Sequence, residues 1–148
     1  MKSLTVSRLL PAPPERVFAL LTDLDGAPGR IRGIKRIEKL VPGPVRVGTR
    51  WKETRVMLGR EASETMEVTA LEPGRRMEVG AQSCGMRYRT VFEVAREGAG
   101  TRVSVTFSGE PVTLVAKLMA PLAGLMMGPV RKCVEADLAD IEKAAAAG

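Results

Sequence analysis

Apolar positions near the N-terminus change from a two-residue period to a helical one. Leu4, Val6 and Leu10 fall at alternating positions, which predicts a half-buried strand. Pro14 and Glu15 then suit the first turn of a helix, because a missing N–H costs nothing there and negative charge favours the helix dipole. The helix that follows has one apolar face, made of Val17, Leu20, Leu21 and Leu24. A strand and a short helix are therefore expected at the start of the chain.

The middle of the chain is a series of strand-like segments separated by turn residues. A loop with one helical turn is expected around residues 25–33. Strand patterns then cover residues 34–41, 48–58, 61–72, 75–83, 86–96 and 101–109. Glycine and proline stand between them, as in Pro73–Gly74, and permit tight reversals. These six strands predict an antiparallel meander, which the N-terminal strand completes as the seventh strand of one sheet.

Two helical segments follow the strands. The stretch Val112–Val130 carries one charge, Lys117, over nearly the length of a membrane span, but Pro121 and Gly124 interrupt it. We therefore expect a buried helix there and no stable membrane insertion. A second apolar helical face consists of Val130, Val134, Leu138 and Ile141. The predicted fold class is α+β, with a curved seven-stranded antiparallel sheet wrapped around a long C-terminal helix and short helices between strands 1 and 2.

Size and composition are those of one globular unit. The chain has 148 residues, of which 45% are hydrophobic and 27% charged, so we expect a single domain over residues 1–148. Cys84 and Cys133 lie far apart and predict neither a disulfide framework nor a zinc site. The N-terminus has no apolar run long enough for a secretory signal, so we expect a cytoplasmic protein.

A net charge of +6 raises the question of an acidic partner. The largest basic stretch contains Arg30, Arg32, Lys35, Arg36 and Lys39. Residues 30–39 include no aromatic side chain on which nucleic-acid bases stack. We therefore interpret the stretch as a solvated basic face and expect no nucleic-acid partner.

The order of the predicted elements resembles that of a known superfamily. Four local sequences carry the same resemblance: Ala12–Phe18, Val47–Trp51, Leu71–Pro73 and Gly100–Val103. Nearly the whole chain is similar to the helix-grip domain of the START-like superfamily, also called SRPBCC or polyketide cyclase/dehydrase-like proteins. The resemblance implies a cavity between sheet and C-terminal helix, because similar proteins bind sterols, lipids, plant hormones or polyketides there. A minority of them catalyse cyclisation or dehydration.

Strand alternation predicts which side chains line such a cavity. The predicted ligand-binding residues are Trp51, Arg55, Met57, Met66, Met77, Met86, Tyr88, Phe92, Leu118, Leu122 and Met126. Methionine is frequent among them, and its flexible side chain suits either a pocket that adapts to varied apolar ligands or simple core filling. Both interpretations stay open at this point.

The strand predicted at 48–58 mixes apolar and charged groups on one face. That face presents Trp51, Glu53, Arg55 and Met57. If it points inward, Arg55 is a buried cation suited to a ligand carboxylate or polarised carbonyl. If it lies at the cavity mouth or the sheet edge, Glu53 and Arg55 are a solvated pair. The sequence leaves the two orientations open.

The chain contains no histidine, which removes the commonest general base near neutral pH. No glycine-rich phosphate loop or dinucleotide fingerprint is present, and we expect no cofactor and no metal site. What remains is carboxylate or phenol chemistry. The weak catalytic candidates are Glu53, Glu67 and Tyr88, acting with Arg55.

Three functional hypotheses follow. The first is binding of a small hydrophobic ligand, such as a lipid, polyketide or other apolar metabolite, by a monomer or homodimer. The alternative is a polyketide cyclase- or dehydratase-like enzyme that uses glutamate, tyrosine and arginine groups in the cavity. The third is an interaction module without a ligand. Fold resemblance alone does not choose among them.

Overall fold

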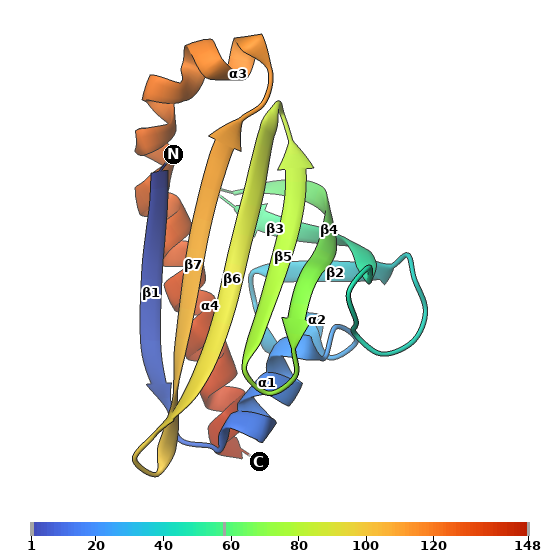
Figure 1. Ribbon diagram of the computed structural model, residues 1–148, viewed down its shortest axis with the longest axis vertical. Coiled ribbons are helices and arrows are strands. Elements are labelled where there is room, and N and C mark those ends of the chain that lie inside the picture. The colour runs from blue at the N-terminus through green and yellow to red at the C-terminus, as the bar shows by residue number, and fades with distance from the viewer. Residues whose placement is uncertain (1, 58, 148) are drawn as a thin grey trace.

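In the computed structural model, which describes residues 2–57 and 59–147, seven antiparallel strands form one sheet. The strands are β1 (Lys2–Leu10), β2 (Ile34–Lys39), β3 (Arg50–Met57), β4 (Arg60–Glu72), β5 (Arg76–Ser83), β6 (Met86–Glu97) and β7 (Gly100–Pro111). Their order across the sheet is β1-β7-β6-β5-β4-β3-β2, so six strands form a meander and β1 joins it beside β7 (Figure 1). The predicted strand boundaries in the meander lie within two residues of these.

Over the described residues, five helical elements complete the fold. They are α1 (Pro14–Thr22), α2 (Ala27–Arg30), α3 (Leu114–Met119), the 3-10 helix η1 (Ala120–Met126) and α4 (Met127–Ala147). The short helices α1 and α2 lie between β1 and β2, and α4 runs along one face of the sheet (Figure 1). The predicted α+β helix-grip architecture is confirmed.

The core is densest where α4 and α1 meet β1 and β7. Four side chains there are at most 1% exposed: Leu10, Val17, Val103 and Leu138. They come from β1, α1, β7 and α4, so the apolar stripe of the last helix does pack on the sheet. Thr101 at the start of β7 donates a hydrogen bond to the Ala12 carbonyl at 2.6 Å, which fixes the chain between β1 and α1.

The turn between β5 and β6 supports the start of α3. Cys84 and Gly85 both have positive φ, 51° and 76°, as a two-residue hairpin turn requires. The Val112 N–H donates to the Gly85 carbonyl at 2.8 Å. A Cβ on Gly85 would lie 2.4 Å from the Thr113 hydroxyl oxygen, which caps α3 by accepting from the Ala116 N–H. Glycine is therefore needed here for both backbone conformation and space.

The segment that follows is not the buried helix expected from its sequence. The chain bends between α3 and α4, and three of its leucines, Leu114, Leu118 and Leu125, are 73–76% exposed. Figure 1 places α3 at the end of the molecule, beyond the tips of the strands, where no sheet lies against its outer side. Pro121 has no N–H with which to continue the hydrogen bonding of α3, and it stands in the first turn of η1, so the segment is not one straight helix with a single buried face.

The basic stretch at residues 30–39 is exposed in part, but its charges are paired. The pairs are Arg30–Asp23 (3.0 Å), Arg32–Asp140 (3.1 Å), Lys35–Glu61 (2.5 Å), Arg36–Glu38 (3.6 Å) and Lys39–Asp25 (3.7 Å). Each cation of the stretch thus has an acidic neighbour. The net positive charge of the chain is not concentrated there as a free basic surface.

Two aspartates one turn apart on α4 bind arginines from the β2–β3 side of the sheet. Asp140 accepts hydrogen bonds from the backbone N–H of Arg32 at 3.0 Å and from its Nε at 3.1 Å. Asp137 accepts two bonds from the Arg55 guanidinium, from Nη1 at 3.2 Å and from Nη2 at 2.7 Å. Such paired contacts are geometrically specific as well as strong. They fix α4 against the half of the sheet where its apolar packing is sparse.

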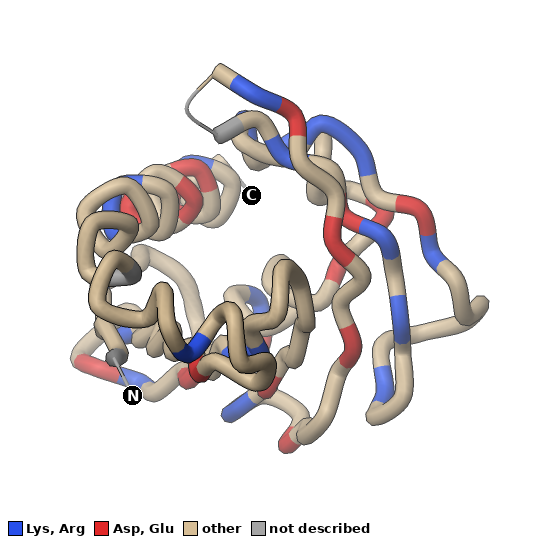
Figure 2. The backbone as a smooth tube through the Cα atoms, turned by 90° about the horizontal axis from the view of Figure 1, so that it is seen from above, with Lys and Arg blue, Asp and Glu red and all other residues tan. Residues whose placement is uncertain are grey.

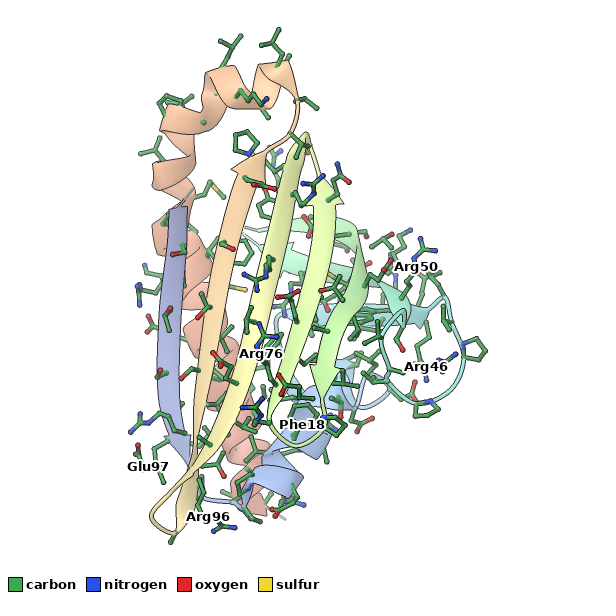
Figure 3. All side chains as sticks on the ribbon, in the orientation of Figure 1. Phe18, Arg46, Arg50, Arg76, Arg96 and Glu97 are labelled. Carbon is green, nitrogen blue, oxygen red and sulfur yellow. The ribbon has the colours of Figure 1, made fainter. Side chains whose placement is uncertain are left out.

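Substitution of Arg55, which points inward from β3, tests the contact with Asp137, and Arg50, which points outward from the same strand, provides the control. Arg55→Met leaves the carboxylates of Glu53 and Asp137 without their cation, so it should lower the free energy of unfolding by about 1–3 kcal/mol, a value reduced because the cavity admits water. The matched control is Arg50→Met, on the exposed rim of the same strand (Figure 3). It should change the free energy by less than about 0.5 kcal/mol. Urea unfolding compares the two, and equal effects would contradict a structural role for Arg55.

Candidate functional site

A cavity of about 1030 Å³ lies between the concave face of the sheet and the helices. Side chains from β2 to β7 line one side of it, and α1, α2, α3, η1 and α4 line the other. Most of these side chains are apolar. A cavity of this size is at the upper end of the range seen for small-molecule sites.

Most of the side chains that the sequence predicts for the cavity do lie around it. They are Trp51, Arg55, Met66, Met77, Met86, Tyr88, Phe92, Leu122 and Met126. Leu118 does not, and that expectation is wrong: its side chain is 73% exposed, because α3 turns Val115, Ala116 and Met119 toward the cavity instead. The side chain of Met57 lies outside the described residues. Ligand binding by these residues stays a prediction.

The mixed face of β3 points inward. Trp51 is 4% exposed and Glu53 8%, and both line the cavity with Arg55. The Trp51 Nε1–H donates to Glu53 Oε1 at 3.2 Å, and Arg55 Nε donates to Glu53 Oε2 at 2.6 Å. The orientation at a solvated cavity mouth or sheet edge is therefore wrong.

Every side-chain nitrogen of Arg55 donates to a protein group. Besides its bonds to Glu53 and Asp137, its Nη1 lies 3.4 Å from the Cys133 sulfur. Burial opposes the charge, but the bonds and charges of Asp137 and Glu53 outweigh burial and raise the pKa of Arg55 above its ordinary value. Burial also raises the pKa of Asp137, and the two bonds from Arg55 limit that rise. The guanidinium is thus a permanent cation, and each of its nitrogens already donates to a protein group.

Glu64 is a cavity carboxyl that the sequence analysis did not identify. It faces Glu53 across the β3–β4 pair, and no ion pair to Glu64 is found among the residues that the structure describes. Burial raises the pKa of Glu64, and the neighbouring Glu53 charge raises it further, while Ser83 and Arg55 act in the opposite direction. Glu64 therefore binds a proton more readily than an ordinary glutamate.

Tyr88 lies within the influence of Glu64. Its ring stacks on Phe107 with centroids 5.5 Å apart. A Cβ on the cross-strand residue Gly109 would lie 3.0 Å from the ring, so glycine provides the space that the ring occupies. Burial and the Glu64 charge raise the pKa of Tyr88, which keeps its hydroxyl protonated. In the described part of the chain this hydroxyl has no hydrogen-bond partner, and it can donate to a ligand.

The other two catalytic candidates fare differently. Glu67 is exposed on the opposite face of β4, 3.7 Å from Arg50 Nε, so its placement in a reaction centre is wrong. The strand alternation that turns Met66 inward turns Glu67 outward. Glu53 does face the cavity, but both of its carboxylate oxygens accept hydrogen bonds from Trp51 and Arg55. Among the carboxyl and phenol groups of the described lining, Glu64 and Tyr88 are the ones left to act on a ligand.

The open side of the cavity is bordered by exposed apolar residues. Val115, Met119, Leu122 and Met126 line the cavity and are also 44–71% exposed. Figure 2 shows α3 and η1 as a nearly uncharged stretch at the end that faces the viewer. Among the described residues no single helix has the length and apolarity of a membrane span; only the bent pair Leu114–Leu122 and Gly124–Ala147 meets that composition.

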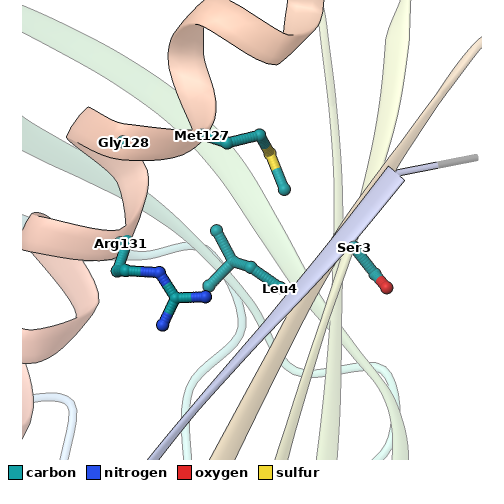
Figure 4. Close-up of a pocket in the computed structure, with 5 residues that line it drawn as sticks. All are labelled: Ser3, Leu4, Met127, Gly128 and Arg131. Carbon is teal, nitrogen blue, oxygen red and sulfur yellow. The ribbon is translucent and has the colours of Figure 1, made fainter.

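A smaller pocket of about 360 Å³ lies where the start of α4 approaches β1. Met127 and Arg131 of α4 face Leu4 of β1 across it (Figure 4). Arg131 reaches the Thr5 carbonyl at 3.5 Å. Its described lining, which consists of Ser3, Leu4, Met127, Gly128 and Arg131, contains no cluster of groups suited to chemistry.

Comparison with known proteins gives the family. The family model described as polyketide cyclase / dehydrase and lipid transport matches residues 1–146. No curated protein matches the sequence.

Solved structures share the fold over nearly their whole length. TTHA0849 from Thermus thermophilus is 25% identical, with a TM-score of 0.81 and coverage of 99% of this chain and 98% of its own. Ara h 8.0201 is 16% identical, with a TM-score of 0.79 and 99% of both chains covered. The Zhui aromatase/cyclase from Streptomyces sp. R1128 is 15% identical, with a TM-score of 0.77 and coverage of 97% and 93%. The START-like resemblance is confirmed, and the chain belongs to the polyketide cyclase / dehydrase and lipid transport family.

Proposed function

We propose that the chain binds a small, mainly apolar molecule in the cavity between the sheet and α4. The observation that carries the proposal is a cavity of about 1030 Å³ with a predominantly apolar wall. Burial of apolar ligand surface in such a wall is worth roughly 25 cal/mol per Å² before the costs of association. The family description, which names lipid transport beside cyclase and dehydrase, supports the same reading.

The cavity wall also contains flexible methionine side chains and a tryptophan whose fluorescence can report on binding. The methionines that line the cavity are Met66, Met77, Met86, Met119, Met126 and Met127. Their unbranched side chains fit ligands of different shape, which favours the pocket interpretation over simple core filling. Trp51 is the single tryptophan of the chain and lines the cavity, so its fluorescence reports on a molecule bound there.

Filling the cavity should abolish binding without disturbing the fold. Thr90 lines the cavity from β6, and Thr90→Phe places a ring in it. The affinity for the uncharged fluorescent probe N-phenyl-1-naphthylamine should fall about tenfold or more, because steric overlap displaces the ligand. Thr65→Phe, on the exposed face of β4, is the matched control and should bind as the native chain does. Native mass spectrometry of the purified protein identifies any molecule that it carries. Unchanged probe binding by Thr90→Phe would contradict the cavity as the binding site.

A second candidate function is acid–base catalysis of cyclisation or dehydration. The observation that favours it is the pair Glu64 and Tyr88, two protonatable groups with raised pKa values that line the same apolar cavity. A desolvated carboxyl can remove a proton next to a ketone and return it to a leaving hydroxyl. Tyr88 can donate a hydrogen bond to the oxygen that gains charge.

The pH dependence of stability tests the state of Glu64. Because the folded chain holds this proton more tightly than the unfolded chain, ionisation of Glu64 costs stability as the pH rises through its folded pKa. Glu64→Gln cannot ionise, so its stability relative to the native chain should be more favourable at about pH 7.5 than at about pH 4. Urea unfolding at both pH values measures the difference. A difference that does not change with pH would show that the carboxyl is not perturbed.

Turnover separates catalysis from binding. The molecule that mass spectrometry identifies, incubated with the native protein, should be converted if the second candidate is correct. Glu64→Gln should then lose about 100-fold or more of the rate while it keeps the affinity, as expected when a general acid or base is removed. Product analysis by chromatography decides, and equal rates in the native chain and Glu64→Gln would remove Glu64 from any mechanism.

A further inference from the structure

The charges at the polar end of the cavity are unequal. Among the described residues that line it, the charged side chains are Glu53, Glu64 and Asp137 against one cation, Arg55. These groups come from the adjacent strands β3 and β4 and from α4, and Tyr88, Ser83 and the two cysteines also line the cavity. With the carboxyls ionised, the cluster is negative overall.

The single cation is not available to a ligand anion. Arg55 donates from Nε to Glu53 and from both Nη atoms to Asp137, so each of its nitrogens already donates to a protein carboxylate. A ligand carboxylate would have to displace Glu53 or Asp137 and leave that group buried and unpaired, which is costly. The role of Arg55 as an anchor for a ligand carboxylate, considered from the sequence, is therefore disfavoured by the geometry.

Glu64 offers the opposite chemistry. Its carboxyl lines the cavity and forms no ion pair in the described part of the chain, so it can accept a hydrogen bond from a ligand. A ligand carboxylate placed beside it would meet a like charge in a poorly solvated space. A ligand hydroxyl or amine would instead donate to a carboxyl whose charge Arg55 offsets only in part.

We propose that this end of the cavity binds a hydrogen-bond donor, a hydroxyl or an amine, next to Glu64 and that it rejects carboxylates. The inference rests on the ligand binding proposed above and adds the class of ligand to it. The apolar body of the ligand lies along the methionine-rich wall, and its polar end meets Glu64 and Tyr88. Burial and the Glu53 charge raise the pKa of Glu64 and outweigh the opposing effects of Ser83 and Arg55, which is consistent with a carboxyl that no cation fully compensates.

Two probes of equal chain length test whether the cavity prefers a hydroxyl to a carboxylate. Decanol and decanoate share the apolar body and differ in the polar end, and their binding to the full chain at about pH 7.5 is measured by calorimetry and by Trp51 fluorescence. Decanol should bind about tenfold or more tightly than decanoate, because the carboxylate meets a cluster whose net charge is negative. Decanoate binding as tightly as decanol, or more tightly, would overturn the proposal and leave cavity binding intact. Binding of neither probe would overturn the proposed function and this inference with it.

Two isosteric variants identify the group that discriminates. Glu64→Gln removes the unpaired negative charge, so decanoate should gain about threefold or more in affinity while decanol does not gain. Glu67→Gln removes the same charge from the exposed face of the same strand and should leave both affinities unchanged. Circular dichroism confirms that both variants fold. A decanoate gain that is equal in the two variants would reflect net charge alone and would overturn the assignment to Glu64.

Discussion

The contact on which the site depends is the fork between Arg55 and Asp137. It joins β3 to α4 across 82 positions of sequence, through the cavity wall rather than the core. Apolar packing joins α4 to the other half of the sheet, through Leu138 and Ile141. One helix is therefore held by two kinds of interaction, one ionic and one apolar. A wholly apolar contact on both sides would favour closer packing and less space.

The same fork determines the chemistry of the cavity. The Arg55 guanidinium donates its hydrogen bonds to Glu53 and Asp137. These two carboxylates balance its positive charge, and the contact holds β3 and α4 together. The groups left over are Glu64, whose cross-strand neighbour is another acid, and Tyr88, whose ring position depends on the space at Gly109. Arginine in a cavity often binds anions, but here Glu53 and Asp137 already accept its hydrogen bonds, and Glu64 faces the cavity without an ion pair among the described residues.

Local periodicity explains what the sequence could and could not predict. Alternation assigned Met66 and Met77 to the cavity, and one further step of the same alternation leads to Glu64. Asp137 also falls on the apolar stripe of α4, between Val134 and Leu138, where a carboxylate is unexpected and indicates a partner. The identity of that partner was not predictable, because Arg55 lies far away in sequence. Leu118 was misplaced because the helix break at η1 changes which side of α3 faces inward.

The two halves of α4 have different surroundings: the C-terminal half packs in the core and the N-terminal half borders the cavity. This difference explains how the domain can have both a packed core and a large cavity. Toward its C-terminus, Leu138 is 1% and Ile141 5% exposed, as in an ordinary core. Toward its N-terminus, Met127, Val130 and Val134 are only half-buried and border the cavity. The segment before them, α3 and η1, adds apolar side chains without closing the space. Folding energy is thus concentrated where α1, β1 and α4 meet. At the other end of α4, the apolar side chains border a space that the chain does not fill. Burial of apolar ligand surface against this wall would therefore be favourable.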